Sequence, residues 1–366
     1  MNYRKKHIPF ANPSISEEEA KRVYEAVSKQ MLRYGENISL FENIVAKYVG
    51  VKYAIAVSSG TTALHTALLA LNICHNDEII MPSFTCAPPA IATVLCGAKP
   101  TYADIEGETL NIDPHDIKRK ITERSKGVIP IHYAGHPAEL DEIQEIADKY
   151  SLCLIEDAAE AFGAIYKGKK VGSFGDVAIL SFSPNKTITT GEGGMILTNN
   201  SEIAERCRII RDYGQNGRFN YITLGSNYHM TEFQAAIGVV QMKKIGEIIE
   251  RKRKIAKIYN DMLSDHVRIP VEKPYVKHVY MSYYIRVPSK IRDKLIRSLE
   301  VKGIETRVYF PPLHMQPFYS KFSSSSLPIT EKVYGEIINL PMSPVMRESD
   351  VLYVCEIIIN FLRKVL

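Results

Sequence analysis

The sequence predicts an α/β fold with a mainly parallel sheet, followed by a smaller C-terminal α+β domain. From residue 78 onward, short apolar runs that suit buried strands alternate with segments whose apolar residues recur at helical spacing. Such alternation is typical of parallel sheets, which bind ligands at the carboxyl ends of their strands. From about residue 250 the pattern changes to a charged stretch and then to mixed short segments. We therefore expect a large domain over residues 1–249 and a smaller one over residues 250–366.

The elements can be placed in chain order. Ser16 and Glu19 form a capping box that begins a first helix, and residues 351–362 suit a packed amphipathic helix near the end of the chain. The charged run 250–254 is interpreted as a solvated face of a long helix. Between these segments, the patterns predict strands over 53–57, 78–81, 127–131, 153–156, 177–182 and 280–287, and helices over about 40–48, 63–71, 140–149, 235–254 and 293–302.

Composition and charge exclude several classes of protein. With 45% hydrophobic and 24% charged residues, the chain of 366 residues suits neither a disordered protein nor a coiled coil. Its net charge of +5 is small and spread out, which argues against nucleic-acid binding but suits an anionic substrate. The sequence has no CxxC pair, no signal peptide and no apolar run long enough to span a membrane. We expect a cytoplasmic protein with reduced cysteines, no membrane segment and no metal site.

The stretch from Ser58 to Thr62 lies between a predicted strand and a predicted helix. The amides of Gly60, Thr61 and Thr62 would point, with the positive end of the helix dipole, at one spot that suits a phosphate. An ordinary N-capped helix would show the same residues, so both interpretations stay open.

Residues 181–195 contain one lysine, Lys186, between an apolar run and a glycine-rich segment. The glycines Gly191, Gly193 and Gly194 would let the backbone turn closely around a ligand. A partly desolvated amine loses some of its preference for the charged form and can attack carbonyl groups, as in enzymes that bind pyridoxal phosphate (PLP). The alternative is a surface lysine in a loop.

Two carboxylates and a hydroxyl are predicted near this lysine. Asp157 ends a buried strand, where a carboxylate needs a partner such as the protonated pyridine nitrogen of PLP. Glu160 follows one helical turn later and can face the same pocket. Ser181 could offer its hydroxyl to the phosphate of the cofactor.

With these residues in place, the sequence resembles the DegT/DnrJ/StrS-type PLP-dependent sugar aminotransferases, which have fold type I. Glutamate at position 160 and the segments 186–190 and 304–307 are most similar to GDP-perosamine synthases. The segments that carry the resemblance cover nearly the whole chain in the family's order: 58–61, 128–137, 156–163, 172–176, 181–186, 189–194, 227–236 and 304–314.

The resemblance implies roles for single residues. Lys186 would bind PLP covalently and then move a proton, with pyridoxamine phosphate as the intermediate form, while Asp157 would hold the pyridine nitrogen. Glu160 would lie near the ring hydroxyl. Asn227 would reach the phosphate of the neighbouring subunit's cofactor, in a homodimer with shared active sites. His314 and Arg307 would lie near the sugar.

Two positions depart from the family pattern. Cys86 stands where relatives usually have an aromatic residue that stacks on the PLP ring. Phe84, on the same side of an extended segment, could partly compensate, or packing alone could hold the ring. Pro88 and Pro89 stand where relatives have small or polar residues.

The implied activity is amino transfer from L-glutamate to a nucleotide-linked keto-sugar, with a 4-keto-6-deoxyhexose as the expected acceptor. A smaller phosphorylated ketone is an alternative acceptor, and a regulatory protein that binds PLP without turnover is an alternative of another class. The related sugar dehydratases have histidine in place of the lysine, so Lys186 argues against that activity.

Overall fold

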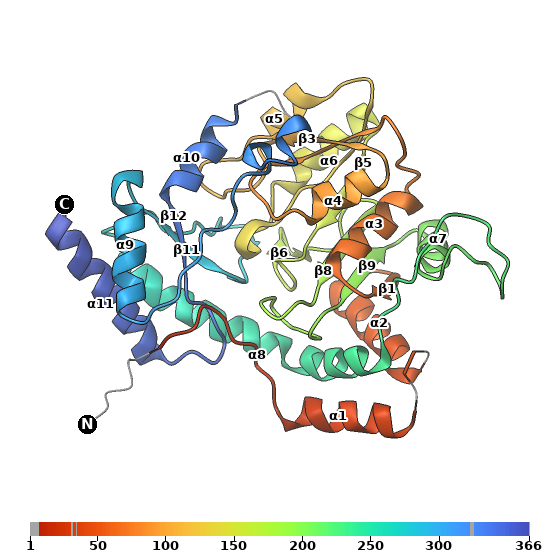
Figure 1. The fold of residues 1–366 in the computed structure, drawn as a ribbon, viewed down its shortest axis with the longest axis horizontal. Helices are drawn as coiled ribbons and strands as arrows, with labels where there is room; N and C mark the ends of the chain where they lie inside the picture. The colour runs from red at the N-terminus through yellow and green to blue at the C-terminus, as the bar shows by residue number, and fades with distance from the viewer. Residues whose placement is uncertain (1–6, 31, 34, 323–325, 366) are drawn as a thin grey trace.

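A computed structural model describes residues 7–30, 32–33, 35–322 and 326–365. A seven-stranded sheet forms its centre, with the strand order β1-β9-β8-β5-β4-β2-β3 (Figure 1). Pairing is parallel from β3 through β2, β4 and β5 to β8, and β9 runs antiparallel to both of its neighbours. The prediction of a mainly parallel sheet is confirmed. The strands are β1 (Tyr53–Val57), β2 (Glu78–Pro82), β3 (Lys99–Ala103), β4 (Ser125–Val128), β5 (Cys153–Asp157), β8 (Val177–Ser181) and β9 (Gly194–Thr198).

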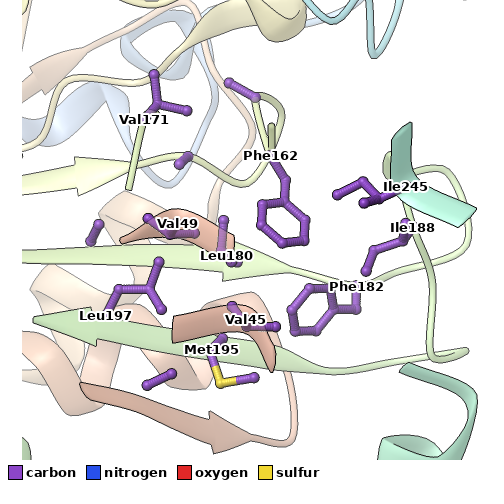
Figure 2. Close-up of a cluster of buried hydrophobic side chains, with 14 of the residues drawn as sticks. Val45, Val49, Phe162, Val171, Leu180, Phe182, Ile188, Met195, Leu197 and Ile245 are labelled. Atoms are coloured by element: carbon purple, nitrogen blue, oxygen red, sulfur yellow. The ribbon is translucent and has the colours of Figure 1, made fainter. Parts of the chain in front are cut away.

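Helices cover both faces of this sheet. Successive residues of β8 alternate between two buried clusters, as the pleat requires: Leu180 packs toward α2 and α8, and Ile179 packs toward α3, α4 and α7. Figure 2 shows the first cluster, in which Val45 and Val49 of α2 meet Leu180. The helices of this part are α1 (Glu17–Ser28), α2 (Glu36–Val49), α3 (Gly60–Ala70), α4 (Pro88–Leu95), α5 (Pro114–Lys120), α6 (Leu140–Tyr150), α7 (Ser201–Arg211) and α8 (Glu232–Leu263).

A second core lies around the C-terminal strands β11 (Tyr283–Arg286) and β12 (Ile337–Leu340), which pair antiparallel. The end of α8 contributes Tyr259 and Leu263 to this core. Because α8 is continuous across residue 250, the predicted boundary falls inside a helix, and the division into two domains stays a prediction. The remaining elements are β6 (Ile165–Tyr166), β7 (Lys169–Lys170), β10 (Val276–Lys277), α9 (Ser289–Val301), α10 (Pro328–Glu336) and α11 (Glu348–Val365).

Most predicted elements occur, with shifted ends. The capping box of Ser16 and Glu19 begins α1 as expected. The second helix begins at Glu36 rather than near residue 40, and β4 ends at Val128 rather than at residue 131. Within the described ranges, no helix combines the length and the apolar character needed to cross a membrane.

The prediction that residues 250–254 form a solvated helix face is wrong for Lys252, whereas Glu250 and Lys254 are exposed. Lys252 is only 2% exposed, because the C-terminal part covers this turn of α8. Its neighbours also contact that part: Arg251 donates to the Met346 carbonyl, and Arg253 donates to the His278 carbonyl. A run of charges near the middle of a long helix therefore lies between two packed regions.

Candidate active site

A cavity of about 270 Å³ opens at the carboxyl ends of the central strands. It brings together most of the predicted site residues, from segments far apart in the chain, at the place where parallel sheets bind ligands. The predicted residues that line it are Gly60, Thr61, Cys86, Asp157, Glu160, Ser181 and Lys186.

The start of α3 forms one wall of this cavity. Ser59 and Thr62 make a reciprocal cap, in which the Thr62 amide donates to Ser59 Oγ (3.1 Å) and the Ser59 amide donates to Thr62 Oγ1 (3.0 Å). Thr62 therefore stabilises the turn and does not line the cavity. The amides of Gly60 and Thr61, in the first turn, have no acceptor within the helix and suit an anion. The N-capped helix is therefore observed, and the phosphate site stays a prediction.

The glycines next to this turn serve the packing of the chain itself. A Cβ on Gly60 would lie 2.9 Å from Ser181 Cβ, and one on Gly194 would collide with the Ser59 carbonyl. The turn before α3 therefore packs directly on β8 and β9. Packing against the Ser59 turn therefore accounts for Gly194, and the turn of the glycine-rich segment around a ligand stays a prediction.

Two buried carboxylates face the cavity. Asp157 accepts a hydrogen bond from the Ala159 amide (3.1 Å), and burial raises the pKa of its carboxyl group to about 6. Glu160 Oε2 accepts from the Ala134 amide (2.9 Å), which fixes the side chain at the cavity wall. Its other oxygen, Oε1, lies 3.6 Å from Lys186 Nζ.

The Lys186 amine is nearly enclosed. Burial by itself lowers its pKa, but the negative charges of Glu160 and Asp157 outweigh that effect, so the pKa lies above its ordinary value. The prediction that desolvation makes this amine less basic is therefore wrong for the cofactor-free protein. That prediction considered the burial of the amine and left out the two carboxylates, whose charges raise the pKa.

The aromatic side of the cavity differs from the prediction. Phe84 does not line the cavity and packs against Tyr133, with ring centroids 5.1 Å apart. Tyr309 and Phe310 line it instead, as a stacked pair with centroids 4.7 Å apart. The sequence analysis did not assign Tyr309 and Phe310 to the site. Their position as an aromatic pair directly before two prolines was the feature that could have indicated it. Burial raises the pKa of the Cys86 thiol to about 12, so this residue lines the wall as a neutral group.

Three predicted residues do not line the cavity of the single chain. Asn227 is exposed and forms a backbone bridge with Asp212. His314 Nδ1 lies 2.7 Å from Ser83 Oγ, and its Nε2 lies 3.3 Å from Glu331 Oε1. Arg307 has a half-exposed side chain and lines a separate groove.

The chemistry of the lining fits PLP. Free helix amides and the Ser181 hydroxyl suit a phosphate, and a buried carboxyl whose pKa is raised gains from a cationic ring nitrogen. A primary amine and a planar aromatic pair complete the set. The described structure therefore offers a group for each part of this cofactor.

A sequence model of the DegT/DnrJ/EryC1/StrS aminotransferase family matches residues 13–359. An uncharacterized protein of Methanocaldococcus jannaschii is 41% identical, over 99% of this chain and 98% of its own length. A protein named GDP-perosamine synthase from Escherichia coli O157:H7 is 40% identical, over 97% of this chain and 99% of its own length. The crystal structure of S. venezuelae DesV in complex with a ketimine intermediate superposes with a TM-score of 0.94 at 30% identity, and the match covers 97% of this chain and 98% of that one.

Proposed function

Since the chain belongs to the DegT/DnrJ/EryC1/StrS aminotransferase family and is a PLP-dependent sugar transaminase, we propose that it transfers an amino group from L-glutamate to a nucleotide-linked 4-keto-6-deoxyhexose. One observation carries the proposal. The Lys186 amine faces two buried carboxylates in a cavity that begins at a helix N-terminus.

Bound PLP supplies an aldehyde that condenses with primary amines and a ring that accepts the electron pair of a neighbouring carbon. Asp157 would hold the ring nitrogen, because a carboxylate without a cationic partner is unfavourable at this depth. The amides of Gly60 and Thr61, with the Ser181 hydroxyl, would hold the phosphate. Cys86 would lie along the ring without stacking on it.

Lys186 would hold the cofactor and then move a proton. Once its amine is free, Glu160 lies within reach of Nζ at 3.6 Å and can keep the ammonium inside the cavity. The Ala134 amide fixes the Glu160 carboxylate, so the ammonium has a defined position. An amine held in this way can give a proton to a substrate carbon and take one back without leaving the site.

Support for the acceptor comes from the relatives and from the cavity wall. Proteins named GDP-perosamine synthase match nearly the full chain, which favours a nucleotide-linked sugar. Tyr309 and Phe310 offer a planar apolar surface in the cavity wall. We place His314 and Arg307 near the sugar as part of this proposal.

We also infer a homodimer with shared active sites. The segment that precedes Asn227 presents four large apolar side chains to solvent, each more than half exposed: Phe219, Tyr221, Ile222 and Leu224. Such a patch favours burial against another protein surface. A second copy there would bring Asn227 toward the neighbouring cofactor. We further propose that the protein is cytoplasmic.

The acceptor can be tested directly. Purified protein with PLP and L-glutamate would be incubated separately with GDP-, UDP- and dTDP-linked 4-keto-6-deoxyhexoses and with a small phosphorylated ketone. Mass spectrometry of the products should show an amino sugar from one nucleotide sugar, and none from the Lys186→Ala variant. An amine formed only from the small ketone would favour the alternative acceptor. No product, together with no 2-oxoglutarate released from glutamate, would favour a regulatory role without turnover.

A further inference from the structure

A second lysine, Lys252, is buried in the middle of α8. Its side chain is 2% exposed, and Nζ donates one hydrogen bond, to the carbonyl oxygen of Met281 (2.9 Å). Among the described residues, no carboxylate forms an ion pair with it. Buried ammonium groups almost always have an anionic partner, because a carbonyl oxygen offsets little of the lost hydration. The position of Lys252 is therefore unfavourable by itself.

A small cavity connects Lys252 with the back of Lys186. Its volume is about 10 Å³, room for roughly one water molecule, and both lysines line it. Thr187 also lines it, and the buried hydroxyl of Thr187 has no hydrogen-bond partner within the described part of the chain. Lys186 thus lines both the active-site cavity, called the front cavity below, and this second cavity, called the back cavity.

The two sides of Lys186 differ in charge. Asp157, Glu160 and Cys86 act on its amine from the front, where Glu192 and Tyr309 also line the cavity. At the back, apart from the two lysines, the polar side chains in the lining are neutral: Asn12, Ser14, Asn185, Thr187, Thr189 and Gln241. Besides Lys186 itself, the charged side chain in the lining of the back cavity is that of Lys252.

Both lysines are affected by this arrangement. Burial first, and then the charge of Lys186, lower the pKa of Lys252 to about 8. Repulsion between two charges is mutual, so Lys252 also disfavours the protonated form of Lys186. The carboxylates in front act more strongly, which leaves the pKa of Lys186 above its ordinary value.

We propose that Lys252 is a positioning residue that acts through Lys186: its ammonium, which donates to the Met281 carbonyl and shares the back cavity with Lys186, opposes a second positive charge on the Lys186 amine. This inference rests on the proposed role of Lys186 as the reacting amine. Its consequence is that, below about pH 8, where Lys252 is still charged, Lys186 gives up its proton more readily than the front carboxylates alone would allow. A purely structural role would only connect α8 to the segment before β11.

Two variants separate these roles. Lys252→Gln keeps an N–H donor for the Met281 carbonyl and removes the charge, whereas Lys252→Arg keeps the charge. In cofactor-free protein with 13Cε-labelled lysine, NMR would follow the titration of Lys186, assigned by its absence in Lys186→Met. Lys252, with its pKa lowered to about 8, loses its proton before Lys186 does. We therefore expect the Lys186 midpoint to stay near the wild-type value in Lys252→Gln and to move downward by at least about half a pH unit in Lys252→Arg, whose charge persists at that pH. An unchanged midpoint in a folded Lys252→Arg protein would overturn the proposal.

The reciprocal measurement follows the titration of Lys252 in the Lys186→Met variant. It needs no substitution at position 252, so it serves even if the variants there fail to fold. Lys186→Met should raise the midpoint of Lys252 by a comparable amount, since the coupling between two sites is the same in both directions. No shift of Lys252 there would overturn the proposal without any variant at position 252.

A third measurement uses the protein with PLP bound. The visible band of bound PLP should titrate at a higher pH in Lys252→Gln than in the wild type. If no such band forms in the wild type, the proposed function fails, and the cofactor-free titrations still decide whether the two lysines are coupled.

Discussion

The two sides of Lys186 present opposite environments to the same amine. In front lie two buried carboxylates, and behind lies Lys252 among neutral groups. Lys252 is buried and Lys186 is nearly so, yet the pKa of Lys186 is raised and that of Lys252 is lowered to about 8. The difference teaches that burial alone does not set the basicity of a lysine, because the charges that face the amine determine the sign of the shift.

The buried ionisable groups around Lys186 lower the stability of the folded protein. Asp157, Glu160 and Lys252 are all buried and ionisable. Apolar residues at these positions would favour folding, so the charges are better explained by what they do to Lys186 and to a ligand.

The largest effect is expected when the amine itself is removed. Lys186→Ala should lower the transamination rate by at least about a thousandfold, because proton transfer at the substrate carbon loses its donor and acceptor. The rate of 2-oxoglutarate release from glutamate measures this. Lys257→Ala, at an exposed position of α8, is the matched control and should keep the wild-type rate. A rate within tenfold of the wild type in Lys186→Ala would exclude the proposed role.

Asp157→Asn should separate activity from stability. The rate should fall by about a hundredfold, because the amide cannot pair with a protonated ring nitrogen as a carboxylate does. The cofactor-free variant should nevertheless unfold at a higher temperature near neutral pH, since the buried charge is gone.

The pH dependence of this gain follows from the raised pKa. Asp157 binds a proton more tightly in the folded state, so its contribution to stability is present below pH 4 and is lost as pH rises to about 6. The advantage of Asp157→Asn should therefore reach up to about 3 kcal/mol above pH 6 and vanish near pH 4. Urea unfolding across this range measures it. An advantage that does not change with pH would contradict the account.

Glu160→Gln removes the charge nearest to the amine and keeps an acceptor for the Ala134 amide. The pKa of Lys186 should fall, since burial and Lys252 would then be opposed by Asp157 alone among the front carboxylates. The 13Cε titration of the cofactor-free protein reads this directly, and the rate should change by about tenfold or less. A higher pKa of Lys186 in Glu160→Gln would contradict the charge assignment of the front side.

The smallest effect is expected at the aromatic wall. Tyr309→Leu should raise the KM for the sugar substrate by a few-fold, because it removes a planar surface from the cavity. Phe84→Leu is the control, since Phe84 lies in the core beside Tyr133. That control should lower the free energy of unfolding by about 1 kcal/mol and leave KM unchanged. The reverse result, with KM changed only by Phe84→Leu, would restore the original prediction for Phe84.

The sequence predicted the parts of the site that follow strands directly. Asp157 and Ser181 end strands, and Lys186 follows five residues after Ser181, so local patterns were sufficient to place them at one edge of the sheet. Tyr309 and Lys252 were missed for the same physical reason. Each arrives from a distant part of the chain, and only the packing of α8 and the C-terminal segments shows which side of them is covered.

The position at which PLP binds covalently tests the central claim most directly. The PLP-loaded protein would be reduced with borohydride, digested, and its peptides analysed by mass spectrometry, with and without prior addition of L-glutamate. The account predicts the pyridoxyl group on the peptide that carries Lys186, and far less of it when glutamate is added first. A label on Lys252 or on a surface lysine, or a label on Lys186 that glutamate does not reduce, would contradict it.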